Sequence, residues 1–144
     1  MWNKKVTQIM TDNVITVNEN DTLEEVYALL KDNNIHHIPV VNQDLEMLGI
    51  ISYQDIVKLF HPSTAYNHPT GWEKTKFYLR TLLAKEVMTE HVFGLSSDSY
   101  LKDAAHLLME NQFHCIPILH EKRVVGMITP LDLIRYSLLE NQTI

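Results

Sequence analysis

The segment that decides the fold runs from His36 to Asp55 and reads HHIPVVNQDLEMLGIISYQD. A second segment, from His114 to Asp132, reads HCIPILHEKRVVGMITPLD and repeats its pattern. A shift of 78 residues places Ile38-Pro39 on Ile116-Pro117, and after the loss of one residue in a polar stretch the shift is 77. Two copies of one supersecondary unit usually bury their apolar faces against each other. The sequence therefore predicts a duplicated fold with symmetry-related clefts between its halves.

The match extends outward from these segments, because the same shift places Met10-Thr11 on Met88-Thr89. Apolar periodicity predicts the same order of elements in each copy: a strand, a helix, two strands and a last helix. In the first copy these are residues 14–17, 21–30, 38–41, 47–51 and a helix from 52; in the second they are 92–95, 99–108, 116–119, 124–128 and a helix from 129. The fold class is α+β, built from two β-α-β-β-α repeats.

Local signals add detail to this organisation. Asp21 followed by Glu24 fits a capping box at the start of the first helix. Pro39 and Pro117 lack an N–H, so we expect each at a strand end or edge. We assign residues 5–60 to the first repeat, 61–83 to a linker and 84–137 to the second repeat. The linker should be a loop followed by a helix from about Trp72; we expect a plain tether, with a partner contact or a lid as the alternative.

Composition limits the function. The 144 residues carry a net charge of −6 and no Lys/Arg run, which argues against non-specific electrostatic binding of nucleic acid. Cys115 is the single cysteine, which excludes an intramolecular disulfide and fits a reducing compartment. No apolar run resembles a signal peptide or a membrane span. We therefore expect a cytoplasmic protein without membrane contact.

The candidate site is the pair of strand-to-helix junctions. Ser52 and Thr129 each fall at the start of the last helix of a copy, where free N–H groups and the helix dipole suit a phosphate. Asp55 and Asp132, three residues later, could accept hydrogen bonds from the vicinal hydroxyls of a ribose. A glycine three residues before each hydroxyl residue would allow a close approach to the backbone. These glycines are Gly49 and Gly126.

A second interpretation of the junctions is equally strong. Ser or Thr followed three residues later by an acid is a helix-capping box, and Pro130 at the first helical position fits it as well. Duplication copies a cap as faithfully as it copies a ligand site. The residues alone leave capping and ligand binding about equally favoured.

The whole pattern resembles a tandem pair of CBS domains, also called a Bateman module. The Met-Thr pairs, the His-x-Ile-Pro segments that begin at His36 and His114, and the two Gly-hydrophobic-x-Ser/Thr-x-x-Asp junctions carry this resemblance. It covers residues 5 to about 137. It implies two repeats packed with pseudo-twofold symmetry into one module, which commonly forms a homodimer and binds adenosine nucleotides in the clefts between the repeats.

The resemblance also implies roles for individual residues. Ser52 and Thr129 would contact phosphate, Asp55 and Asp132 the ribose. The histidines before the prolines would reach phosphate, and the adenine would lie against the first strand and the Ile-Pro segments. The remaining residues of this expected nucleotide site are Val14, Thr16, His36, His37, Ile38, Pro39, Val92, His114, Ile116 and Pro117.

Some positions depart from the family pattern. No Arg accompanies the histidines, Cys115 replaces a potential cation, and Thr16 is matched by Gly94. His36 and His37 point to opposite faces of a strand, so we expect no metal there. We expect a non-catalytic regulatory module that senses AMP, ADP or ATP, needs no cofactor and acts through its own homodimer or an unidentified protein partner. The alternative is a structural dimerisation or docking module without a small ligand.

Overall fold

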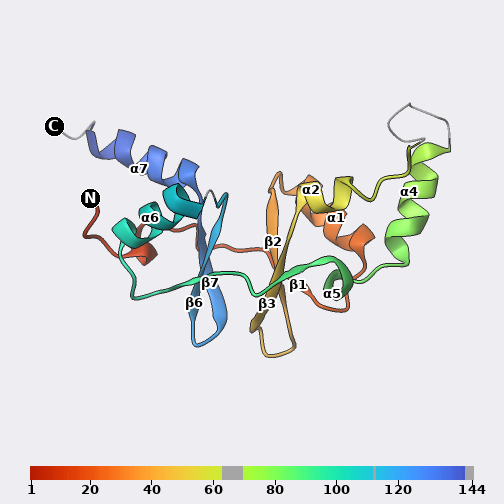
Figure 1. Cartoon of the computed structure of the whole chain (residues 1–144), viewed down its shortest axis with the longest axis horizontal. Helices are drawn as coiled ribbons and strands as arrows, with labels where there is room; N and C mark the ends of the chain where they lie inside the picture. Colours follow the sequence, from red (N-terminus) through yellow and green to blue (C-terminus); the bar gives the residue numbers. More distant parts are fainter. Residues whose placement is uncertain (63–69, 112, 142–144) are drawn as a thin grey trace. The chain divides into compact units, whose positions relative to one another are not determined.

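The computed structural model describes residues 1–62, 70–111 and 113–141 of the chain. Its elements group into two compact units (Figure 1). The central unit is Ile15–Val92, and the terminal unit combines Met1–Val14 with Phe93–Ile144. Each unit contains a small sheet with helices beside it, so the predicted α+β class and the duplicated order of elements are confirmed.

The central unit is built on a four-stranded sheet in the order β1-β2-β3-β4. The strand β1 is parallel to β2, and the other two pairings are antiparallel. The side chains of Leu23, Ile38 and Ile51 lie in its core and are fully buried. The elements are β1 (Val17–Asn18), α1 (Leu23–Asp32), β2 (His37–Val41), β3 (Met47–Ser52), α2 (Tyr53–Val57), α4 (Gly71–Arg80), α5 (Ala84–Val87) and β4 (Thr89–Glu90).

The terminal unit repeats this plan with a three-stranded sheet in the order β5-β6-β7. Its core contains Leu101, Ile116 and Ile128, which occupy the positions of Leu23, Ile38 and Ile51 in the other copy. The elements are η1 (Val6–Gln8), β5 (Leu95–Ser96), α6 (Leu101–Asn111), β6 (Ile116–His120), β7 (Arg123–Ile128) and α7 (Pro130–Asn141). No helix in the described part of the chain is long and apolar enough to cross a membrane.

The first helix starts one residue later than its capping signal suggested. The N-cap is Thr22, whose Oγ1 accepts a hydrogen bond from the Glu25 N–H at 3.3 Å. The Glu25 carboxylate accepts one from the Thr22 N–H at 3.2 Å and completes the capping box. Asp21 instead accepts from the Asn18 N–H at 2.8 Å. The expected Asp21–Glu24 box is therefore wrong, because Thr22 and Glu25 have the same spacing.

The two prolines do not lie at strand ends. Pro39 is the third residue of β2, and Pro117 is the second residue of β6. In each sheet the parallel ladder begins only at the next residue, with Val17 beside Val40 in one unit and Leu95 beside Ile118 in the other. The missing N–H therefore removes no rung of these ladders. The first strands are also shorter and later than expected, since only two residues of each pair with the sheet.

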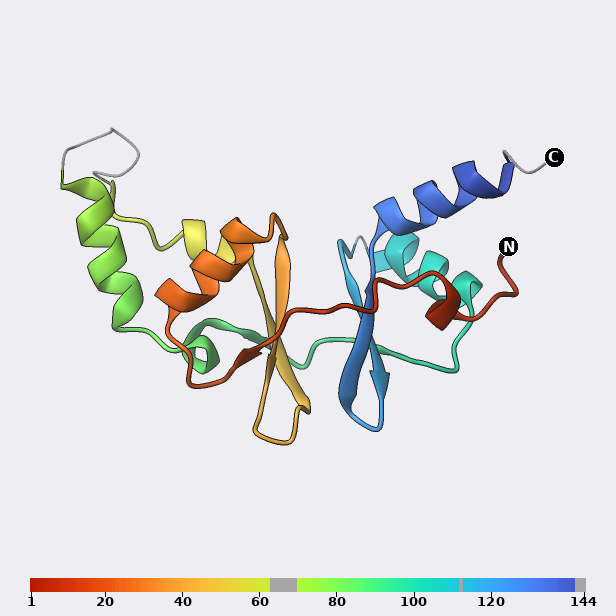
Figure 2. The ribbon, with the colours of Figure 1, turned by 180° about the vertical axis from the view of Figure 1, so that it is seen from behind.

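Each compact unit contains the first segment of the other repeat, an arrangement we call arm exchange. The Met10-Thr11 segment bridges to Met127 of β7, and the Val6 N–H donates to the Ser99 carbonyl at 2.9 Å. Figure 2 shows this N-terminal segment beside the elements of the terminal unit. In the central unit, Thr89 and Glu90 form β4 on the edge of β3. The sequence repeats and the compact units are therefore different divisions of the chain.

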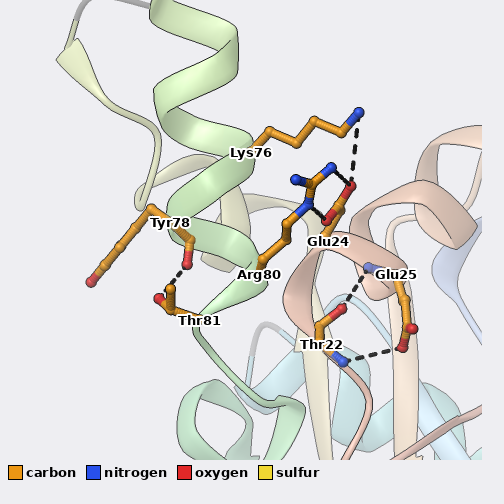
Figure 3. Close-up of polar contacts among 7 residues, drawn as sticks. All are labelled: Thr22, Glu24, Glu25, Lys76, Tyr78, Arg80 and Thr81. Carbon is orange, nitrogen blue, oxygen red and sulfur yellow. Dashed lines mark hydrogen bonds and ion pairs between the residues drawn. The ribbon is translucent and has the colours of Figure 1, made fainter.

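The helix α4 packs against α1 and belongs to the central unit (Figure 3). The Glu24 carboxylate on α1 pairs with the Arg80 guanidinium and, at 3.8 Å, with the Lys76 ammonium. Leu79 and Thr75 are fully buried. This part of the expected linker is thus a packed element rather than a plain tether, and its helix ends at Arg80 rather than near Leu83. Residues 63–69, part of the expected loop, lie outside the described residues.

Candidate functional site

The central junction joins β3 to α2 and is closed by a capping box. The Ser52 N–H donates to Oδ2 of Asp55 at 2.9 Å, and the Asp55 N–H donates to Oγ of Ser52 at 3.1 Å. The Tyr53 N–H donates to the His36 carbonyl at 2.8 Å, which ties the start of α2 to the start of β2. Both side chains of the box are half-buried. The capping interpretation is therefore realised at this junction.

The terminal junction, between β7 and α7, has the same geometry. The Thr129 N–H donates to Oδ2 of Asp132 at 2.8 Å, and the Asp132 N–H donates to Oγ1 of Thr129 at 3.3 Å. The Thr129 hydroxyl also donates to Oδ2 of Asp132, at 3.1 Å. Pro130 follows as the first residue of α7 and contributes no N–H.

The capping box at each junction uses only one oxygen of the aspartate carboxylate. The hydrogen bonds that the side chains of Asp55 and Asp132 accept all go to Oδ2. Within the described ranges, no hydrogen bond or ion pair reaches Oδ1 of either side chain. A carboxylate oxygen has two acceptor positions, so each Oδ1 can still accept from a hydroxyl. The two interpretations of the junction are therefore compatible.

The backbone N–H groups that the sequence assigned to phosphate are largely engaged. At the central junction those of Ser52, Tyr53 and Asp55 all donate within the protein, which leaves that of Gln54. At the terminal junction the proline has none and the two capping N–H groups are bonded, which leaves that of Leu131. In addition, α2 has only five residues, too few for a strong dipole.

The structure divides the other expected site residues between the two units. The Ile-Pro pairs are buried in the sheets, whereas His36 and His114 just before them are exposed. The first-strand residues are half-buried and lie near the points where the chain passes from one unit to the other. The central unit contains Thr16, His36, His37, Ile38, Pro39, Ser52, Asp55 and Val92; the terminal unit contains Val14, His114, Ile116, Pro117, Thr129 and Asp132.

The replacement of Thr16 by Gly94 has a packing explanation. A β-carbon on Gly94 would lie 2.9 Å from Cδ1 of Leu119 and 3.2 Å from the Pro117 carbonyl oxygen. The residue of the first copy that corresponds to Leu119 is the smaller Val41. The second copy therefore combines a larger strand residue with a glycine beside it.

The glycines of the two junction segments accommodate the exchanged arms. A β-carbon on Gly49 would meet the Thr89 carbonyl oxygen at 2.6 Å, and one on Gly126 would meet Cγ of Met10 at 2.7 Å. The close approach predicted at these positions thus exists. The neighbour in the structure is the Met-Thr segment of the other repeat.

Cys115 lies beside the terminal junction as a neutral group. Burial, followed by the nearby Asp132 carboxylate, raises the pKa of its thiol to about 12. Its side chain therefore brings no charge to this junction at neutral pH, and only a small fraction is thiolate.

Sequence reasoning missed an aromatic cluster that adjoins the central junction. The ring of Tyr53 stacks on that of Tyr27 with 5.8 Å between centroids. Trp72 of α4 and Phe60 lie 5.5 and 5.4 Å from Tyr27. The sequence signal for this cluster is a difference between the two repeats. The positions of Tyr27, Tyr53 and Phe60 are occupied in the second copy by Ala105, Pro130 and Ser137.

The fold and the junctions define a class: a duplicated α+β module with one capped strand-to-helix junction in each repeat. The model of the CBS domain matches residues 6–62 and 84–139, and the chain belongs to this family. The resemblance drawn from the motifs is thereby confirmed.

Known proteins agree with this assignment. An uncharacterized protein of Methanocaldococcus jannaschii is 32% identical over 137 residues, which are 94% of this chain and 32% of that protein. The chain thus spans about a third of the length of that relative. The CBS domain of a membrane protein from Sphaerobacter thermophilus has a TM-score of 0.79 and 27% identity, and covers 93% of this chain and 88% of its own.

A further solved structure is similar and contains ligands. It is the CBS domain pair of protein MJ0100 in complex with 5′-methylthioadenosine and S-adenosyl-L-methionine. It has a TM-score of 0.73 and 25% identity, and covers 95% of this chain and 98% of its own.

Proposed function

We propose that the chain is a non-catalytic regulatory module that binds an adenosine-containing ligand at its strand-to-helix junctions. Asp55 and Asp132 accept hydrogen bonds from the ribose hydroxyls. The observation that carries the proposal is the arrangement of these carboxylates, each fixed through Oδ2 with Oδ1 left to accept. The adenosine compounds bound by the similar domain pair of MJ0100 support the same ligand class.

The other residues would shape the site around this ribose contact. The adenine lies against the Ile-Pro segments of β2 and β6, whose apolar side chains are buried beside the junctions. Ser52 and Thr129 face the 5′ group of the ligand, together with His36 and His114. Binding would favour one conformation of the chain or of its oligomer, which is the signal passed on.

We also propose that the chain forms a homodimer through α7. No residue of this helix is buried, and Leu131, Ile134 and Leu138 are 52%, 56% and 59% exposed. Their spacing of three and four residues places them on one helical face. Sedimentation of an Ile134→Glu variant should show monomer, while Leu45→Glu, at an exposed turn, should sediment like the parent chain. A dimeric Ile134→Glu variant would contradict the use of this face.

The second candidate function is a dimerisation or docking module without a small ligand. The capping boxes favour it, because they alone account for the hydroxyl and acid at both junctions. On this view the loss of Asp55 costs about 1 kcal/mol of stability and nothing else.

Ligand titration of capping variants separates the two functions. Calorimetry with adenosine, AMP, ATP and S-adenosylmethionine would compare the parent chain with Asp55→Ala/Asp132→Ala. Glu25→Ala is the matched control, because it removes the acid of a capping box of the same kind on α1. We expect binding in the control and none in the double variant. Unchanged affinity in the double variant would refute the ribose contact, and a parent chain that binds no compound would favour the docking function.

A further inference from the structure

The two junctions differ in what holds their helices in place. At the central junction α2 has only five residues, and a helix this short gains most of its stability from tertiary contacts. At the terminal junction α7 has 12 residues and begins with Pro130, whose fixed φ suits the first helical position. The backbone of Ser52 and Asp55 therefore depends on neighbouring side chains more than its counterpart in the terminal unit does.

One buried ring, that of Tyr27 on α1, contacts both ends of α2. Tyr53, which directly follows Ser52 of the capping box, stacks on this ring with 5.8 Å between centroids. Phe60, just beyond the end of α2, meets the same ring edge-on at 5.4 Å. The position of the Tyr27 ring therefore limits where the α2 backbone and its capping box can lie.

Trp72 of α4 completes this cluster. Its ring lies 5.5 Å from that of Tyr27 and 5.7 Å from that of Phe60. The helix α4 packs on α1, with Leu79 fully buried. A continuous set of ring contacts therefore joins α4 to the central junction. The second repeat has no aromatic residue at the positions of its three rings, which are occupied by Ala105, Pro130 and Ser137.

We propose that Tyr27 and Trp72 are positioning residues of the central ligand site, so that ligand binding at this junction and the docking of α4 on α1 stabilise each other. The inference rests on the proposed function and adds its regulation. A ligand that contacts Ser52 and Asp55 binds the form of the chain in which α2 is in place, and the packed rings favour the same form. The effect is reciprocal, because the two events are linked by one coupling free energy. The terminal junction is independent of α4.

Calorimetry on chains with a single ligand site tests this link. Asp132→Ala retains the central junction and Asp55→Ala the terminal one, and each is titrated with adenosine, AMP, ATP and S-adenosylmethionine. Adding Trp72→Ala should weaken binding at the central junction at least about fivefold, the lower end of typical coupling between sites, and leave the terminal junction unchanged. Phe77→Ala, on the exposed face of α4, is the matched control and should change neither affinity. Trp72→Phe retains a ring and should restore most of the affinity.

The outcomes separate this inference from the proposed function. Equal affinity of the central junction with and without Trp72→Ala would overturn the inference and leave the proposed function in place. An equal loss at both junctions would also overturn it, because such a loss reflects general damage to the fold. Binding confined to the terminal junction would have the same consequence. If the parent chain binds none of the four compounds, the proposed function itself fails.

Fluorescence provides a second measurement on a chain whose ring cluster is intact. The chain has two tryptophans, and Trp2 belongs to the terminal unit, so a Trp2→Phe chain reports on Trp72 alone. Trp72 is 40% exposed, and a ligand that strengthens the docking of α4 should shift its emission to shorter wavelength. Asp55→Ala should abolish this shift and Asp132→Ala should preserve it. A constant emission maximum, while calorimetry shows that the central junction is filled, would contradict the link.

Discussion

The side chain of Met88 covers Gly49 so closely that a β-carbon on the glycine would lie 2.8 Å from the methionine sulfur. Met10 covers Gly126 in the same way in the terminal unit. Both methionines belong to the exchanged arms, and both glycines lie within the long strands β3 and β7. The two Gly-Met contacts thus fix each arm on the sheet of the other repeat.

The two glycines should differ in their sensitivity to alanine. At Gly49 the new methyl group would collide with the Thr89 carbonyl, which is backbone, whereas at Gly126 its three nearest atoms all belong to the side chain of Met10. We expect Gly49→Ala to lower the free energy of unfolding by about 1–3 kcal/mol, as overpacking does, and Gly126→Ala to lower it less. Urea denaturation of both variants measures the difference. A Gly126→Ala variant at least as unstable as Gly49→Ala would contradict this account of the contacts.

The aromatic cluster should make stability fall at alkaline pH. Burial, with hydrogen bonding to Tyr53 as the next cause, raises the pKa of Tyr27 to about 12. The folded chain therefore keeps Tyr27 neutral while the unfolded chain ionises it near 10. This contribution to stability is complete below pH 10 and is lost as the pH rises to about 12. Tyr27→Phe should make the urea denaturation midpoint less dependent on pH over this range. Tyr78→Phe, at an exposed ring, should leave the pH dependence unchanged.

The docking of α4 should depend on Trp72 and not on its exposed neighbour. Trp72 contacts the rings of Tyr27 and Phe60, whereas Phe77 on the same helix is 70% exposed. We expect Trp72→Ala to cost about 1–2 kcal/mol, since an aromatic pair is worth up to about 1.5 kcal/mol beyond its buried area. Phe77→Ala is the control and should have no measurable effect. Equal stability of the two variants would mean that the ring cluster does not hold α4.

Cys115 should react slowly in the native chain. With a pKa of about 12, its thiolate fraction at pH 8 is roughly one in ten thousand. A chromogenic disulfide reagent should therefore label the native chain much more slowly than the denatured chain, in which the thiol has its ordinary pKa. Asp132→Asn removes the second cause of the raised pKa and should speed native labelling modestly. Rapid labelling of the native parent chain would be incompatible with this burial.

The sequence was sufficient to predict the duplicated order of elements, because apolar periodicity and caps are local signals. The strands 37–41 and 47–52 and their counterparts were predicted within a residue or two. The exact cap was not, because Asp21 and Thr22 precede acids at the same spacing. The first strand was overestimated, because Val14 and Ile15 are apolar but do not pair with a neighbouring strand.

Non-local features could not be read in this way. The Met10 and Met88 segments have the same local pattern whichever repeat they pack against, so arm exchange leaves no signature in sequence spacing. For a related reason, the sequence could not decide whether the junctions serve as helix caps or as ligand sites. Ser52 and Asp55 serve a cap through one set of atoms, and only the structure shows that Oδ1 of the acid remains to accept.

Arm exchange also determines what a single repeat can be by itself. A fragment that stops before Trp72 would have Met10 with no β7 to cover, and its own β3 would lack the strand β4. Two such fragments could supply each other's missing segments, as domain-swapped chains do. The tandem chain is thus the covalent equivalent of a swapped pair.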